Sequence, residues 1–216
     1  IGEKQRIGYS YSRFGITHDG KGDYNLALFF FKKSLKLIED SNNMDRIAET
    51  MKNMGICYRK INELNLAKKF LESALDIESQ IKYDYKKVYI LHELAIVHLK
   101  LKNYEECYLL LEESRSIIKI LGNKKELVLE NDQIMSDYYL ALNNYKQAFN
   151  FYMKYTNGKS EVFTSNKSEK LAEMRILYEA ERRESEIKLL EQQHQLESQK
   201  RKSRGMKKRS ACTCSC

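Results

Sequence analysis

The stretch Ala48–Gln80 decides the fold, and it reads AETMKNMGICYRKINELNLAKKFLESALDIESQ. Each half spaces its apolar residues three and four apart, which predicts two amphipathic helices joined by a short polar turn. The two apolar stripes are Met51, Met54, Gly55 and Tyr58 in the first half, and Leu64, Ala67, Leu71, Ala74 and Leu75 in the second. One helical hairpin of this size buries too little surface to be stable alone, so neighbours of the same kind are expected.

Four features of this stretch recur along the chain at intervals of 40, 40 and 41 residues. They are a small residue in the first helix, a ring-bearing residue three positions later, a bulky residue that opens the second helix, and a second small residue. The positions are Gly15/Gly55/Ala95/Ser136, His18/Tyr58/His98/Tyr139, Tyr24/Leu64/Tyr104/Tyr145 and Ala27/Ala67/Cys107/Ala148. The sequence therefore predicts an all-α solenoid of four stacked hairpins of about 40 residues each.

The four repeats are expected at about residues 1–40, 45–81, 85–121 and 125–155. In the first repeat, we expect Tyr11, Phe14, Gly15 and His18 to point inward. Because the chain has no proline, helix-stopping Gly, Asn and Asp residues are expected to separate the repeats. The separating turns are Ser41-Asn42-Asn43, Lys82-Tyr83-Asp84 and Gly122-Asn123-Lys124.

The remaining residues predict a loop over 156–167, a long helix over 168–204 and a disordered tail over 205–216. Asn166 and Glu169 are spaced as a capping pair for that helix. Its first half carries an apolar stripe that should cap the fourth repeat, formed by Leu171, Met174, Leu177 and Tyr178. Its second half is mostly charged, so residues 181–204 should project into solvent or pair weakly with another copy as a coiled coil.

The hairpins resemble the tetratricopeptide repeat family in three positions, Gly55, Tyr58 and Ala67, and in a bulky residue four positions after the last. That bulky residue is Phe31, Leu71, Leu111 or Tyr152 in the four repeats. The resemblance implies a right-handed superhelical solenoid, although each repeat is longer than the usual 34 residues and lacks the common final proline.

The net charge of +8 comes almost entirely from the C-terminal tail. Residues 200–216 hold seven basic and no acidic side chains, which leaves 31 basic against 30 acidic residues in 1–199. Binding to nucleic acid by the repeats is therefore not expected, because phosphate binding needs a basic surface. No apolar run approaches the roughly 20 residues that span a bilayer, and no signal peptide is visible.

No catalytic or metal-binding motif is complete in the sequence. His92-Glu93 starts like a zinc-protease H-E-x-x-H motif, but the fifth position is Ile96. Cys57 and Cys107 fall on core positions and are expected to be buried small side chains. The C-x-C-x-C end at Cys212, Cys214 and Cys216 could bind a soft metal or imitate a prenylated terminus, but an unstructured or non-native extension is favoured. We expect no enzyme activity, no cofactor and no metal.

Recognition of a protein or peptide is therefore the expected function. Stacked hairpins line a concave groove with their first helices, and the residues one step off the core stripe should face it. The predicted groove residues are Tyr9, Ser12, Ile16, Glu49, Lys52, Ile56, Arg59, Tyr89, His92, Ile96, Gln133 and Asp137. Lys52, Asn53 and Arg59 supply only part of the set that carboxylate-gripping members of the family use, so that specificity is not predicted.

The C-terminal part resembles the sensor regions of signalling proteins of Bacteroidetes, in which a segment like Lys170–Met174 precedes a charged helix, a membrane span and a histidine kinase or helix-turn-helix domain. The resemblance implies a sensory or scaffolding domain, extracytoplasmic if a membrane span follows. The alternative is a stand-alone cytoplasmic adaptor or peptide-responsive regulator without an output domain. Only a flanking segment missing from this sequence would bring the chain to a membrane.

Overall fold

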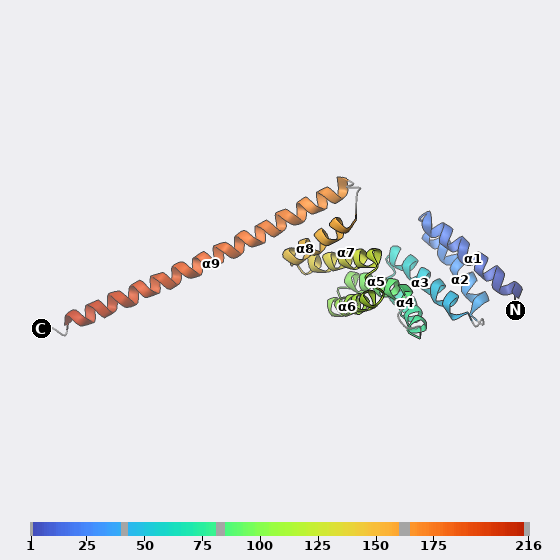
Figure 1. The fold of residues 1–216 in the computed structure, drawn as a ribbon, viewed down its shortest axis with the longest axis horizontal. Coiled ribbons are helices and arrows are strands. Elements are labelled where there is room, and N and C mark those ends of the chain that lie inside the picture. The colour runs from blue at the N-terminus through green and yellow to red at the C-terminus, as the bar shows by residue number, and fades with distance from the viewer. Residues whose placement is uncertain (1, 40–42, 81–84, 160–164, 214–216) are drawn as a thin grey trace. The chain divides into compact units, whose positions relative to one another are not determined.

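The computed structural model describes residues 2–39, 43–80, 85–159 and 165–213, and the side chains of the last helix from 170 to 196. Every regular element in these ranges is an α-helix, and the chain divides into two compact units, Ile1–Val162 and Phe163–Cys216. The first unit contains four consecutive helical hairpins (Figure 1). The second contains α9 (Ser165–Thr213).

Each hairpin pairs a first helix with a second helix, and the pairs stack in chain order. They are α1 (Gly2–Gly20) with α2 (Tyr24–Ile38), α3 (Met44–Lys60) with α4 (Leu64–Glu78), α5 (Tyr85–Lys100) with α6 (Tyr104–Ile120), and α7 (Lys125–Ala141) with α8 (Tyr145–Gly158). The prediction of an all-α solenoid of four hairpins with a long C-terminal helix is confirmed.

The turn inside each hairpin follows one design. The second residue after each first helix has a left-handed backbone, at Gly22 (φ 84), Asn62 (φ 65), Lys102 (φ 61) and Asn143 (φ 56). The next N–H then donates to the carbonyl of the ring-bearing residue at 2.9 Å, from Asp23 to His18, Glu63 to Tyr58, Asn103 to His98 and Asn144 to Tyr139. This bond closes the last turn of the helix and reverses the chain in three residues.

The small residues of the first helices lie where the two helices of a hairpin meet. A Cβ atom on Gly15 would lie 2.5 Å from Cε1 of Phe31, and one on Gly55 would lie 2.6 Å from Cγ of Leu71. Ala95 is fully buried at the equivalent position. Ser136, the fourth member, donates its hydroxyl to the carbonyl of Ala148 at 3.0 Å. These residues are therefore small because a bulky side chain of the second helix occupies the space beside them.

Both cysteines of the repeats are buried, as predicted. Burial raises the pKa of the Cys107 thiol to about 12. Burial, with a smaller contribution from the neighbouring Asp19 carboxylate, does the same for the pKa of Cys57. Both thiols therefore stay protonated at neutral pH and act as small apolar side chains.

Three predictions at the C-terminus are wrong. Helix α8 continues to Gly158, so the loop does not begin at residue 156. Helix α9 begins at Ser165, which puts Asn166 inside the helix and not at its N-cap. The helix also continues through Gly205 to Thr213, because a single glycine costs only about 1 kcal/mol in a helix and no proline follows.

Some predictions fall on residues that the structure does not describe. Residues 40–42 and 81–84 lie in two of the predicted separating turns, and residues 214–216 include the last two cysteines. In the third turn, Gly122 and Asn123 follow the end of α6 and adopt a left-handed backbone, with φ values of 79 and 54, as suits helix-stopping residues. The capping role of the first half of α9 stays a prediction.

Among the described residues, no helix is both long enough and apolar enough to cross a membrane.

Candidate partner-binding face

The first helices of neighbouring repeats contact one another. Helix α1 contacts α3, α3 contacts α5 and α5 contacts α7, whereas the second helices make no comparable contacts with each other within the described residues. Helices on the inner side of a curved stack approach each other, and those on the outer side spread apart. We call the exposed side of α1, α3, α5 and α7 the inner face.

Ion pairs between repeats cross the inner face. Nε of Arg59 on α3 lies 2.6 Å from Oε2 of Glu93 on α5, and both side chains are only 17% exposed. Lys60 on α3 pairs with Asp19 on α1 at 2.8 Å. Lys86 on α5 pairs with Asp45 on α3. These contacts join α1 to α3 and α3 to α5, so several charges of the inner face have structural partners.

Eleven of the twelve predicted groove residues are at least partly exposed. Ile16, Tyr89 and Gln133 are exposed, and the partly exposed members are Tyr9, Ser12, Glu49, Lys52, Ile56, Arg59, Ile96 and Asp137. One register forms an aliphatic row along three first helices, Ile16, Ile56 and Ile96. The row ends at Asp137, the equivalent residue of the fourth repeat.

The prediction for His92 is wrong, because its side chain is only 1% exposed. Its Nδ1 lies 3.1 Å from Oε2 of Glu130 on α7, so the neighbouring repeat covers the ring. Ser12 and Lys52 hold the same register in the first two repeats and are partly exposed. A partner chain cannot reach the imidazole of His92 without moving α7.

The cations of the inner face differ in their availability. Arg59 donates from Nε and Nη2 to the two carboxylate oxygens of Glu93, at 2.6 and 3.3 Å. A partner carboxylate would have to displace Glu93 to bind this guanidinium in the same way. Lys52 forms no ion pair with a described residue. Lys52 is therefore the better candidate for contact with an anionic group.

A cavity of about 460 Å³ opens at the α7 end of the inner face. It is lined by Lys125, Glu126, Leu129, Glu130, Gln133, Tyr155, Gly158 and Lys159. Burial raises the pKa of the neighbouring Tyr89 phenol, and the charges of Glu130 and Glu126 raise it further. Sequence reasoning found Gln133 but missed the two glutamates. Successive intervals of four and three residues separate Glu126, Glu130 and Gln133, and this spacing was the available signal that they share one helix face.

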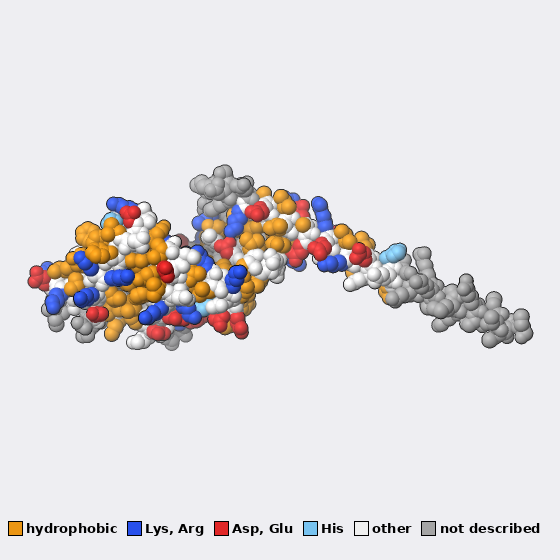
Figure 2. Space-filling model, turned by 180° about the vertical axis from the view of Figure 1, so that it is seen from behind, with side chains coloured by type: hydrophobic (Ala, Val, Ile, Leu, Met, Phe, Trp, Pro, Cys, Tyr) orange, Lys and Arg blue, Asp and Glu red, His pale blue; other side chains and the backbone are white. Residues whose placement is uncertain are grey.

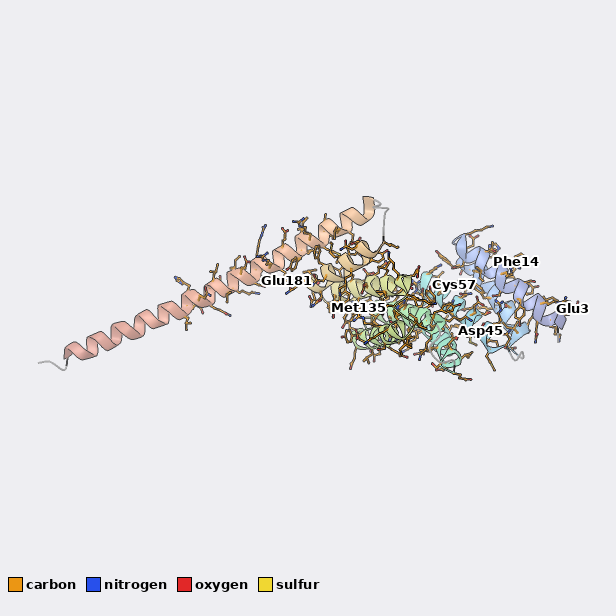
Figure 3. All side chains as sticks on the ribbon, viewed as in Figure 1. Glu3, Phe14, Asp45, Cys57, Met135 and Glu181 are labelled. Atoms are coloured by element: carbon orange, nitrogen blue, oxygen red, sulfur yellow. The ribbon has the colours of Figure 1, made fainter. Side chains whose placement is uncertain are left out.

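The first repeat exposes one phenylalanine on each of its two helices. Phe14 is 54% exposed and Phe29 is 48% exposed, so the prediction that Phe14 points inward is wrong. The equivalent residues Met54, Leu94 and Met135 are all at most 2% exposed. Figure 2 shows hydrophobic side chains gathered over the N-terminal repeats, with lysine and arginine among them, and Figure 3 shows Phe14 on α1.

Comparisons with known proteins agree with the repeat architecture. The family model for the tetratricopeptide repeat matches residues 8–41 and 48–81. Photosystem I assembly protein Ycf3 of Prochlorococcus marinus strain MIT 9301 is 43% identical over 75 residues, which are 35% of this chain and 42% of the relative. The same protein of strain MIT 9303 is 36% identical over 93 residues, 43% of this chain and 52% of the relative. The chain thus spans about half the length of these relatives or less.

Solved structures with low sequence identity share the fold. BtubC (BKLC) from P. vanneervenii superposes with a TM-score of 0.67 at 15% identity, over 80% of this chain and 74% of that one. A putative Podospora anserina kinesin light chain with nearly identical TPR-like repeats gives 0.65 at 14% identity, over 86% and 93%. A Rap protein complexed with competence and sporulation factor gives 0.65 at 16% identity, over 70% and 43%. The tetratricopeptide repeat is thus matched in the first two hairpins, and the next two hairpins repeat the same residue register.

Proposed function

We propose that this chain is a non-catalytic adaptor whose inner face binds an extended peptide or a helix of another protein. The observation that carries the proposal is the inner face itself, on which adjacent first helices together present tyrosine, isoleucine and charged side chains at repeating positions. Surfaces of this mixed composition suit recognition of a polypeptide, because apolar contacts supply affinity and polar contacts fix the register.

The side chains along the inner face suggest which residue types a partner segment carries at each position. The isoleucine row at positions 16, 56 and 96 favours a partner segment with aliphatic side chains spaced along it. The cavity at the α7 end is lined by Glu126 and Glu130 and also by Lys125 and Lys159, which favours a polar side chain at that end of the partner. Lys52 lies on α3 and favours an acidic residue in the middle of the segment.

An adaptor role is supported by the curated relatives, which are named as assembly proteins of photosystem I. We extend to this chain only the general role of holding a protein partner during assembly.

A sensory role in a signalling protein is a second proposal. It is favoured by the continuous 49 residues of α9, because a long helix can relay a change at the repeats to a following domain. Weak pairing of two copies through 181–204 is also proposed, since Ile187, Leu189 and Leu190 are more than half exposed.

The test is capture of a partner by paired variants. Ile56→Lys and Ile96→Lys place charges in the isoleucine row, and Leu109→Lys is the matched control because Leu109 is 61% exposed on the second helix α6. A partner retained from cell extract by the unmodified chain should be lost with both row variants and kept with Leu109→Lys. Retention by the row variants together with loss in Leu109→Lys would place the binding surface on the second helices and contradict the proposal.

A further inference from the structure

A second cavity, of about 370 Å³, lies between the second helix of the third repeat and the first helix of the fourth. It is lined by Arg115, Ile118, Lys119, Asn123, Val128, Asn131 and Asp132. None of these residues belongs to the predicted groove. Its volume is near the lower end of the range for ligand pockets, about 300–1,000 Å³, so it fits a small molecule.

The cavity lies where the other repeat junctions are filled with apolar side chains. Leu35 on α2 and Met51 on α3 belong to the core cluster that contains the first junction. Leu75 and Leu91 hold the equivalent positions at the second junction and also share a core cluster. At the third junction these two positions are Arg115 and Asp132. An aliphatic pair is thus replaced by a guanidinium and a carboxylate, beside open space.

The two charged groups do not bond to each other. Arg115 donates to Oε1 of Glu112 at 2.9 Å and to Oδ1 of Asn131 at 3.4 Å. Asp132 is only 9% exposed and accepts no hydrogen bond from a described residue. Burial raises the pKa of Asp132, while Lys154 and Arg115 lower it. A buried carboxylate without a donor is costly, so a bound group that donates to it would be stabilised.

The other residues that line the cavity supply a fixed amide group, an apolar surface and a positive charge. The Asn131 amide donates to Oγ of Ser114 at 2.6 Å and to the Leu111 carbonyl at 3.1 Å, which fixes its orientation. Ile118 and Val128 supply apolar surface. Lys119 is exposed at the edge and forms no ion pair with a described residue. The cavity therefore combines a buried anion, an open cation and an aliphatic wall.

We propose that this cavity binds a small zwitterion of the amino-acid class, with its ammonium group at Asp132, its carboxylate at Lys119 and a short aliphatic group against Ile118 and Val128. A zwitterion satisfies both charges at once, whereas a simple cation or a simple anion satisfies one. The site is independent of the inner face, so its occupation and the binding of a protein partner can be tested separately.

The test uses three probes of nearly equal size with the full chain. L-valine carries both charges, isobutylamine lacks the carboxylate, and isovalerate lacks the ammonium group. Isothermal titration calorimetry should show saturable binding of L-valine, tighter than either single-charge probe by about tenfold or more. No binding of L-valine at millimolar concentration, or affinity no better than that of isovalerate or isobutylamine, would overturn the proposal.

Three variants locate the binding. Asp132→Asn should weaken L-valine binding by about tenfold or more while leaving the chain folded, because it removes only the charge of a buried group. Lys119→Gln should weaken L-valine but not isobutylamine. Asp76→Asn is the matched control, since Asp76 is exposed on α4 far from the cavity lining in sequence and should change nothing. Equal L-valine affinity in Asp132→Asn and Asp76→Asn would show that any binding occurs elsewhere and would overturn the assignment.

Discussion

The guanidinium of Arg59 and the carboxylate of Glu93 form a two-point contact between α3 and α5, with Nε–Oε2 at 2.6 Å and Nη2–Oε1 at 3.3 Å. The contact joins the second repeat to the third on the inner face. Both side chains are 17% exposed, so the pair is largely shielded from water. A pair in this setting contributes more than a surface ion pair, and loss of one partner leaves the other charge poorly solvated.

Arg59→Ala should therefore lower the free energy of unfolding by about 1–3 kcal/mol in urea. Arg46→Ala is the matched control, because Arg46 pairs with Glu49 on the same helix and its side chain is 55% exposed. That exposed pair should contribute about 0.5 kcal/mol or less. Equal losses in the two variants would show that the Arg59–Glu93 contact is no stronger than a solvated pair.

Gly55→Ala should destabilise the repeats by about 1–3 kcal/mol, because the added methyl group would overlap Leu71. Gly20→Ala is the control. A Cβ atom at Gly20, the last residue of α1, meets nothing within 4 Å, and alanine is the better helix former. Thermal unfolding should therefore show a lower melting temperature for Gly55→Ala and an equal or higher one for Gly20→Ala. A tolerated methyl group at Gly55 would mean that the two helices can separate at little cost.

His98 should make stability depend on pH. Burial lowers the pKa of His98, and Lys68 lowers it further, while Glu106 and Glu72 oppose the shift. Below about pH 6.5 the unfolded chain binds a proton at this position more readily than the folded chain. The free energy of unfolding should fall there, by at most about 1.4 kcal/mol per pH unit.

His98→Tyr tests this assignment, because the equivalent residue is tyrosine in the second and fourth repeats. The variant should lose part of the decline in stability between about pH 6.5 and 5. His194→Tyr, at an exposed position of α9, should keep the decline unchanged. An identical pH profile in all three proteins would assign the acid sensitivity to other groups.

Asp132→Asn should stabilise the chain at pH 7. Since burial raises the pKa of Asp132, the folded chain takes up a proton at this carboxyl at a higher pH than the unfolded chain does. The free energy of unfolding then falls as pH rises from the ordinary aspartate pKa through the raised one. Urea unfolding should show the advantage of the asparagine at pH 7 and its disappearance near pH 4. An asparagine variant that is less stable at pH 7 would indicate a favourable partner for the ionised carboxylate.

The repeat architecture was predictable because it rests on local chemistry. Gly55 must be small beside Leu71, and Glu63 must follow a left-handed residue so that its N–H can reach the Tyr58 carbonyl. Each requirement recurs at a fixed interval and is visible in the sequence. The left-handed residue is glycine or asparagine in three repeats but lysine in the third, so residue type alone does not mark it in every repeat.

The candidate site was less predictable, because helical spacing reports which side of a helix meets its own hairpin partner and not what the next repeat covers. Lys52 and His92 share one register, yet the first is partly exposed and the second is buried under Glu130. Phe14 and Met54 also share a register, and only Phe14 is exposed. These differences depend on neighbouring repeats, which a single-helix pattern does not contain.

We propose that a partner polypeptide lies along the first helices. Site-specific photo-crosslinking tests it most directly, with a photoreactive residue placed singly at Lys52, Ile56, Tyr89 and Gln133, and at Lys69, Leu109 and Asn150 as second-helix controls. All seven positions are at least partly exposed. Crosslinks to one partner should form from the first-helix set, and few should form from the second-helix set. Crosslinks confined to Lys69, Leu109 and Asn150 would contradict the proposal.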